Sequence, residues 1–250
     1  MGQLIIGLGH RARQGKDWAA GYLEKTFQNI HIVHWADELY KEVRHEKYRG
    51  LFPLIKKEGN IFSVFDTIAG NGSPIYRLFT VDDVPKLDKI FFDRGISEYD
   101  GMEGKDSELL QFWGTDYRRN NFGEDYWVIK GKEQIFRISE TTANPIILIP
   151  DTRFYNELDA IYFLGGKYAE VQRFNADGTR YYDTGRDKDH PSERTLDDVR
   201  YDYLISAISG NTKTIENSVF NIIQTEAARN NYELHFKSNI ESIAASLAVA

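Results

Sequence analysis

Apolar residues along the chain occur in two patterns, short continuous runs and runs with helical spacing. Residues 4–8 form a short, mainly apolar run that predicts a buried strand. A turn rich in Gly and Arg follows at residues 9–15, and residues 16–28 then place apolar side chains on one helical face. The same reasoning predicts strands at 31–35, 144–150, 168–174 and 201–208, and helices at 36–45, 107–119, 126–138, 152–164 and 212–227.

Strands that alternate with helices in this way predict an α/β fold with a parallel sheet flanked by helices and right-handed crossovers. Glycine and proline interrupt residues 51–106, for which we expect short helices and loops. Residues 175–191 are polar, contain Gly178 and Gly185 and lack apolar periodicity, which is typical of a mobile lid. We see no linker, and therefore expect one domain over residues 1–250, with a core of about 1–50, 140–174 and 200–230.

Composition and charge narrow the function classes. The chain has 250 residues, and its 31 basic and 38 acidic residues give a formal net charge of −7, which argues against binding to a nucleic-acid polymer. No apolar stretch approaches the ~20 residues of a membrane span, so we expect no membrane association. The absence of cysteine excludes disulfides and thiolate metal sites, and favours a cytoplasmic location.

The segment Gly-His-Arg-Ala-Arg-Gln-Gly-Lys-Asp lies between the first predicted strand and helix. In this context it predicts a phosphate-binding loop, whose backbone N–H groups and helix N-terminus wrap phosphates while Lys16 reaches the outer ones. The alternative is a glycine-rich turn with solvated basic side chains. The residues predicted to bind the phosphates are Gly9, His10, Arg11, Arg13, Gly15, Lys16 and Asp17.

This loop departs from the usual pattern in two ways. Five residues separate Gly9 from Gly15 instead of four, and Asp17 replaces the Ser or Thr whose hydroxyl normally contacts magnesium. Mg²⁺ would then be held by Asp17, by water or by a carboxylate from elsewhere. Asp151 is a candidate because it follows the apolar run at 144–150, and ligands bind at the carboxyl ends of strands in open α/β sheets. The alternative role for Asp151 is to cap the following helix.

Phosphoryl transfer requires charge neutralisation, positioning and exclusion of water more than covalent chemistry. Arg153 is therefore a candidate for neutralising phosphate charge, with a surface ion pair as its alternative. Arg173 at a predicted strand end and Arg180 and Arg186 in the lid are further candidates, and each is otherwise a solvated side chain. Trp127 suits either stacking on a base or a place in the core. Asp37 suits either an acceptor site or the start of its helix.

Several dispersed motifs occur in order between about residues 4 and 215, and together they resemble the bacteriophage deoxynucleoside monophosphate kinases. They are Gly15-Lys16-Asp17, Ala36-Asp37 followed by Leu39, Leu110-Gln111 with Gly114-Thr115, Trp127, Asp151-x-Arg153-Phe154 with Asn156-Glu157, and His190-Pro191-Ser192-Glu193. The resemblance implies a P-loop kinase fold with a helical acceptor-binding insertion at about 51–139 and a lid at about 175–191. It also implies transfer of the γ-phosphoryl group of ATP to a deoxynucleoside 5′-monophosphate with Mg²⁺, by a homodimer in the host-cell cytoplasm.

The resemblance also assigns residues to the acceptor. They are Asp37, Gln111, Gly114, Thr115, Arg119, Trp127, Arg153 and Glu157. Some relatives carry basic residues just before the Leu-Gln motif, where this chain has Ser107 and Glu108, so Arg118 or Arg119 would have to compensate. Two other functions stay open, a P-loop kinase for another phosphorylated or hydroxyl acceptor and a nucleotide-binding protein without turnover.

Overall fold

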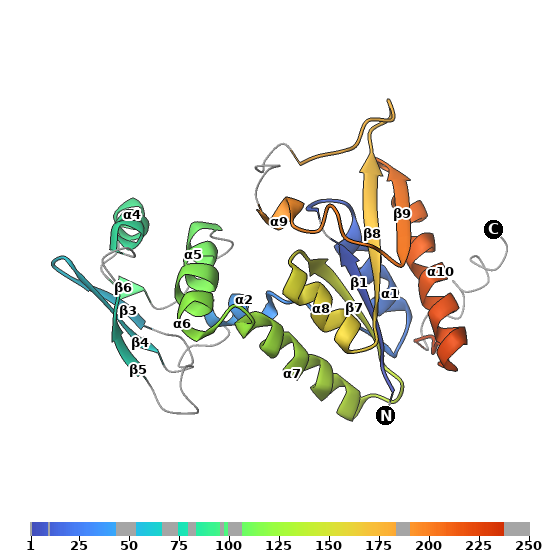
Figure 1. The fold of residues 1–250 in the computed structure, drawn as a ribbon, viewed down its shortest axis with the longest axis horizontal. Coiled ribbons are helices and arrows are strands. Elements are labelled where there is room, and N and C mark those ends of the chain that lie inside the picture. Colours follow the sequence, from blue (N-terminus) through green and yellow to red (C-terminus); the bar gives the residue numbers. More distant parts are fainter. Residues whose placement is uncertain are drawn as a thin grey trace. The chain divides into compact units, whose positions relative to one another are not determined.

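The chain forms two compact units, each with its own sheet (Figure 1). The computed structural model describes residues 2–9, 11–43, 54–66, 75–79, 84–95, 98–99, 107–183 and 191–237. The first unit comprises Met1–Trp35 and Val128–Ala250, and the second comprises Ala36–Trp127. The second unit thus interrupts the first at Ala36 and Trp127, whereas the sequence analysis placed the insertion at about 51–139.

Five parallel strands form the sheet of the first unit, in the order β2-β7-β1-β8-β9. Their bounds are β1 Leu4–Gly9, β2 Ile30–Ile32, β7 Ile146–Thr152, β8 Lys167–Phe174 and β9 Tyr203–Ile208. The helices are α1 Lys16–Thr26, α7 Tyr126–Thr141, whose first two residues belong to the second unit, α8 Tyr155–Phe163, α9 Pro191–Arg194 and α10 Thr212–Asn230. The predicted α/β fold with a parallel sheet flanked by helices is confirmed.

Helices cover both faces of this sheet, which explains why its strands read as continuous apolar runs (Figure 1). Leu4, Ile6 and Leu8 point to one face and pack with α1 and α10. Ile5 points to the opposite face and packs with α7 and α8. Since the strands are parallel, the carboxyl ends of β1, β7, β8 and β9 lie at one edge of the sheet.

The second unit contains a four-stranded antiparallel sheet in the order β5-β4-β3-β6. Its strands are β3 Leu54–Glu58, β4 Ile61–Asp66, β5 Ile75–Leu78 and β6 Glu98–Tyr99. Its helices are α2 Asp37–Val43, α4 Val84–Arg94, α5 Ser107–Gln111, the π-helix η1 Phe112–Arg119 and α6 Asn120–Phe122.

The helix α4 agrees with the short helices predicted for residues 51–106, but the four strands correct the prediction of an insertion without a sheet. Glu58 pairs with Ile61, so that Gly59 and Asn60 form a two-residue hairpin turn. Gly59 has φ +62°, a value that glycine adopts readily and that such turns require at their first central position. Gly-Asn between two apolar segments is a hairpin signal, whereas the prediction for residues 51–106 counts glycine only as an interruption.

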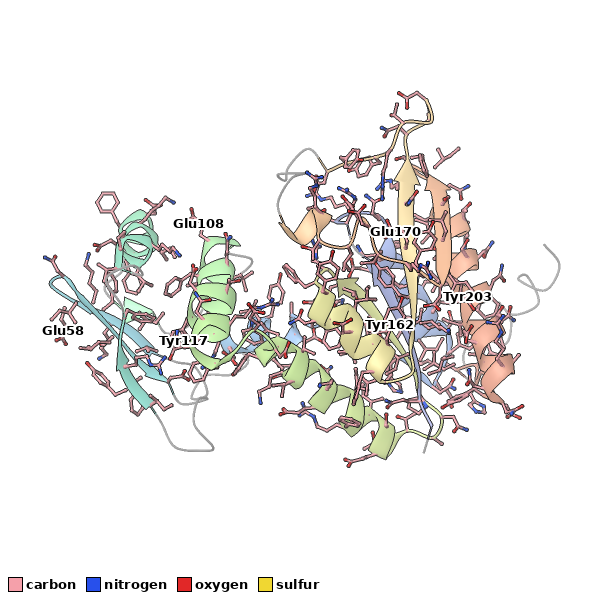
Figure 2. The ribbon with its side chains drawn as sticks, viewed as in Figure 1. Glu58, Glu108, Tyr117, Tyr162, Glu170 and Tyr203 are labelled. Carbon is pink, nitrogen blue, oxygen red and sulfur yellow. The ribbon has the colours of Figure 1, made fainter. Side chains whose placement is uncertain are left out.

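Arg118 anchors the second unit through a buried ion-pair cluster. Its side chain is 0% exposed, and its Nε lies 2.6 Å from Glu42 while its Nη1 lies 2.5 Å from Asp66. The same two carboxylates accept hydrogen bonds from the indole or hydroxyl groups of Trp113, Tyr117 and Tyr126; Tyr117 is labelled in Figure 2. Burial raises the pKa of Glu42, and the neighbouring Arg118 opposes this shift. Because all three nitrogens of its guanidinium are engaged, Arg118 cannot compensate for missing acceptor-binding cations.

We predict that Arg118→Met lowers the free energy of unfolding by about 3–5 kcal/mol, because the substitution leaves the buried carboxylates of Glu42 and Asp66 without a cation. Denaturation in urea measures this loss. Arg137→Met serves as the control, since Arg137 is exposed on α7 and its replacement should change stability by less than about 0.5 kcal/mol. Equal losses in the two variants would contradict a structural role for the cluster.

Candidate functional site

The loop between β1 and α1 lies at the carboxyl edge of the parallel sheet, beside the ends of β7 and β8. Arg13 and Gly15 both adopt left-handed backbone conformations, with φ +53° and +93°. Left-handed residues within a turn are a feature of the backbone sites that bind anions. Gly9 is required for a separate reason, because a Cβ there would lie 1.7 Å from the hydroxyl of Tyr168. His10 lies outside the described residues.

Lys16 is buried beneath this loop, with 3% of its surface exposed. Its Nζ donates a hydrogen bond to the carbonyl of Arg11, so the side chain spans the loop from the first residue of α1. Burial and the nearby charge of Arg153 lower the pKa of Lys16 to about 8, although the carboxylates of Asp17, Glu193 and Asp151 oppose this shift. A buried ammonium group in this setting is stabilised by an additional anion.

Three consecutive loop residues each bind a carboxylate from residues 183–197. Arg11 Nη2 lies 2.6 Å and 2.7 Å from the two oxygens of Asp197. The backbone N–H of Ala12 donates to Oε2 of Glu193 at 2.8 Å. Arg13 Nε lies 3.2 Å from Asp183. Both arginines that the sequence analysis assigns to phosphate binding therefore have acidic partners in the structure.

Arg153 is held by two glutamates. The backbone N–H groups of Arg153 and Phe154 donate to Oε2 of Glu157 at 2.7 Å and 3.1 Å. Arg153 Nη1 donates to Oε1 of Glu193 at 2.6 Å. Glu157 is 3% exposed, and its two backbone hydrogen bonds fix the chain at the start of α8, next to Arg153.

Asp151 and Asp17, the predicted magnesium ligands, both lie near Lys16. Asp151 belongs to the last residues of β7 and accepts a hydrogen bond from the backbone N–H of Trp35 at 3.0 Å. It therefore links the end of β7 to the segment after β2. Asp17 Oδ1 lies 3.2 Å from Nε2 of His34, and this hydrogen bond lowers the pKa of Asp17.

Carboxylate oxygens are the donors that Mg²⁺ prefers, and Mg²⁺ is usually held by one or two carboxylates together with phosphates and water. Asp17 and Asp151 are carboxylates of this kind, and both contribute negative charge near Lys16. Within the described ranges, no group of three or more His, Asp or Glu side chains is arranged to hold a metal. A metal at this site would therefore depend on a bound phosphate for part of its coordination.

Arg173, at the carboxyl end of β8, also contacts the loop. Its Nη1 donates to the carbonyl of Arg13 at 2.9 Å, and its backbone N–H donates to the side chain of Gln14 at 2.7 Å. Its guanidinium lies 4.2 Å from the ring centroid of Tyr181. Arg180 instead pairs with Glu170 at 2.9 Å, a residue of β8 that Figure 2 labels. Of Arg173 and Arg180, the first contacts the loop directly, whereas the second is paired with Glu170.

Of the predicted lid, the structure describes residues 175–183 and Pro191, the first residue of α9. Residues 175–183 turn back on the end of β8, since the N–H of Asn175 donates to Thr179 and that of Tyr181 donates to Arg173. This hydrogen-bonded turn was not predicted. Arg186 and the rest of 184–190 lie outside the described residues.

The residues assigned to the acceptor, apart from Arg153 and Glu157, belong to the second unit. Gln111 and Thr115 are exposed and Arg119 is half-buried. Because the three residues are spaced four apart along α5 and η1, they lie on one side of this helical segment. Trp127 is 3% exposed, and its indole N–H donates to the carbonyl of Gly114 at 2.8 Å, so the structure gives it the core role. Asp37 is the first residue of α2, as the helix-start interpretation requires.

The contact of Gln14 with Arg173 was not predicted, nor were the contacts of Asp183, Glu193 and Asp197 with the loop. Of these residues, only Glu193 could have been identified from the sequence, because it belongs to the motif at 190–193. Gln14, Asp183 and Asp197 each lie far in the sequence from the residue that they contact, and no local pattern relates the two members of a pair.

Comparison with protein-family models and with curated proteins found no match for this chain. Among the described residues, no helix combines the length and apolar character that a membrane span requires.

We predict that Lys16→Met raises the free energy of unfolding at pH 7 by roughly 1–3 kcal/mol, because a pKa shift from 10.5 to about 8 reflects a cost of keeping this buried group charged. Between these two values the unfolded wild type binds more protons than the folded protein. Wild-type stability should therefore rise from pH 8 to 10.5 and reduce the difference. Urea denaturation at several pH values measures both effects.

The exposed Lys25 of the same helix provides the control. Lys25→Met should change the free energy of unfolding by less than about 0.5 kcal/mol at each pH and should retain the wild-type rise between pH 8 and 10.5, because Lys16 is still present. A Lys16→Met variant that is less stable than wild type at pH 7 would show that the charge of Lys16 is already fully compensated.

Proposed function

We propose that the protein transfers the γ-phosphoryl group of ATP to a deoxynucleoside 5′-monophosphate. The observation that carries the proposal is the buried Lys16, which spans the loop between β1 and α1 at the carboxyl edge of a parallel sheet. A charged lysine in such a place is costly without an anion and well placed to bind a phosphate. The five-stranded parallel sheet flanked by helices is compatible with a P-loop kinase fold.

The surroundings of Lys16 support transfer of the phosphoryl group as well as binding. Charge on a phosphoryl group in transit is stabilised by fixed cations, and Arg153 acts on Lys16 electrostatically while Arg173 contacts the loop. Asp17 and Asp151 would hold Mg²⁺. When bound, Mg²⁺ would neutralise the phosphate oxygens of ATP and orient them.

The acceptor is supported by the ordered motifs and by the exposed polar side of α5 and η1. A π-helix is uncommon and is often found at functional sites, and η1 carries Thr115 and Arg119 between the exposed Gln111 and α6. These side chains suit an acceptor that offers a base edge and a phosphate. A homodimer and a cytoplasmic location belong to the same proposal.

The direct test is release of ADP in the presence of ATP, Mg²⁺ and each of the four deoxynucleoside monophosphates. The proposal expects at least one monophosphate to stimulate ADP release and to be converted to its diphosphate. A kinase for another acceptor would release ADP only when that acceptor is supplied. Binding of ATP without stimulation by any acceptor would indicate a nucleotide-binding protein without turnover and would refute the proposal.

We predict that Asp151→Asn slows turnover by about a hundredfold and raises the Mg²⁺ concentration needed for half-maximal activity, because the variant loses a carboxylate charge near the metal. The asparagine oxygen can still accept the hydrogen bond from Trp35, so the link between β7 and the segment after β2 is retained. Magnesium titrations of the initial rate provide the measurement.

Asp202→Asn is the matched control, because Asp202 also accepts a hydrogen bond from a backbone N–H, that of Tyr168 at 2.9 Å. Asp202 precedes β9 and therefore lies at the amino edge of the sheet, away from the predicted metal site. Its rate and magnesium dependence should match the wild type. An unchanged magnesium titration for Asp151→Asn would leave Asp151 with the structural link alone.

A further inference from the structure

Glu193 joins two parts of the site that are far apart in the sequence. Its Oε2 accepts the backbone N–H of Ala12 in the loop at 2.8 Å, and its Oε1 accepts Nη1 of Arg153 at 2.6 Å. The glutamate is 6% exposed. No role follows for Glu193 from the sequence, although it belongs to one of the ordered motifs.

The geometry of this bridge requires a carboxylate. Each of the two oxygens accepts from a different donor, whereas a glutamine side chain offers one acceptor and one donor. A glutamine would therefore lose one of the two contacts and place its N–H₂ against a donor. Of the acidic side chains, aspartate retains both acceptors but is shorter by one methylene group.

Arg153 is immobilised at both ends by this arrangement. Glu157 holds its backbone N–H and Glu193 holds its guanidinium. The charge of Glu193 also acts on Lys16 in the sense opposite to that of Arg153, so it reduces the repulsion between the two cations. Two like charges can then remain close together before any phosphate arrives.

We infer that Glu193 is a positioning residue of the phosphoryl-transfer site, which holds the guanidinium of Arg153 and the loop backbone at Ala12 in one fixed arrangement. The inference rests on the proposed function. Binding and transfer then depend on a guanidinium that is oriented beforehand, and catalysis gains from orientation of this kind. The opposite possibility is that the Glu193 carboxylate competes with phosphate for the loop.

A double-mutant cycle between Glu193→Gln and Arg153→Met tests the inference without depending on turnover. The probe is inorganic triphosphate, and calorimetry measures its dissociation constant. If Glu193 acts through Arg153, each single variant weakens binding by about five- to tenfold, and the double variant is no weaker than the weaker single variant within about twofold.

The kinetic readout separates positioning from simple binding. Glu193→Gln should lower kcat by about ten- to a hundredfold, while KM for ATP rises by no more than the five- to tenfold loss of triphosphate affinity. Glu193→Asp should recover part of kcat, because both acceptors are present. It also replaces Glu193→Gln in the cycle if that variant does not fold.

Glu226→Gln is the matched control, because Glu226 is also a buried glutamate paired with an arginine, Arg229, at 2.6 Å. It lies on α10 beside Tyr203, at the start of β9 and away from the carboxyl edge of the sheet. Its triphosphate affinity and kcat should match the wild type even if its melting temperature falls.

Three results would overturn the inference. Tighter triphosphate binding by Glu193→Gln would show that the carboxylate competes with the anion. Independent, additive losses in the cycle would show that Glu193 does not act through Arg153. Absence of triphosphate binding by the wild type would remove both the inference and the proposed function. If triphosphate binds but no acceptor stimulates ADP release, the kinase proposal fails, and the binding cycle alone decides the role of Glu193.

Discussion

The buried ammonium group of Lys16 is the constraint around which the carboxyl edge of the first unit is arranged. Its charge is far from water, and one hydrogen bond to the carbonyl of Arg11 does not replace a hydration shell. Carboxylates from the end of β7, the start of α1 and α9 supply part of the compensation, but the pKa of Lys16 stays low. The charge of Lys16 is therefore only partly compensated in the folded protein, and a bound anion would stabilise it further.

The sheet topology explains how such distant residues meet. β1 lies in the middle of the order β2-β7-β1-β8-β9, so the loop after it has the ends of β7 and β8 on either side. Asp151 and Arg153 come from the β7 side, while Arg173 comes from the end of β8. Parallel strands alone give this convergence, because all their carboxyl ends lie at one edge.

Local patterns were sufficient to predict much of the first unit. Strands buried on both faces are continuous apolar runs, and Lys16 was correctly expected to begin the first helix. The prediction misses the antiparallel sheet of the second unit, because glycine can mark either an interruption or a hairpin turn and only the pairing of β3 with β4 decides for the turn. The contacts of Glu193, Asp183 and Asp197 with the loop could not be predicted, since each depends on residues more than 160 positions away and on the folded path between them. The core role of Trp127 likewise depends on packing that helical spacing does not specify.

The pKa of Lys16, followed by NMR through its side-chain signals in the free protein and with inorganic triphosphate, tests the central claim most directly. The account predicts a value of about 8 in the free protein and a rise toward the ordinary value of lysine when triphosphate binds, because the anion stabilises the charged form. The Lys16→Met variant identifies the signal. A free-protein pKa near 10.5, or a value that triphosphate leaves unchanged, would contradict the assignment of this loop as the phosphate site.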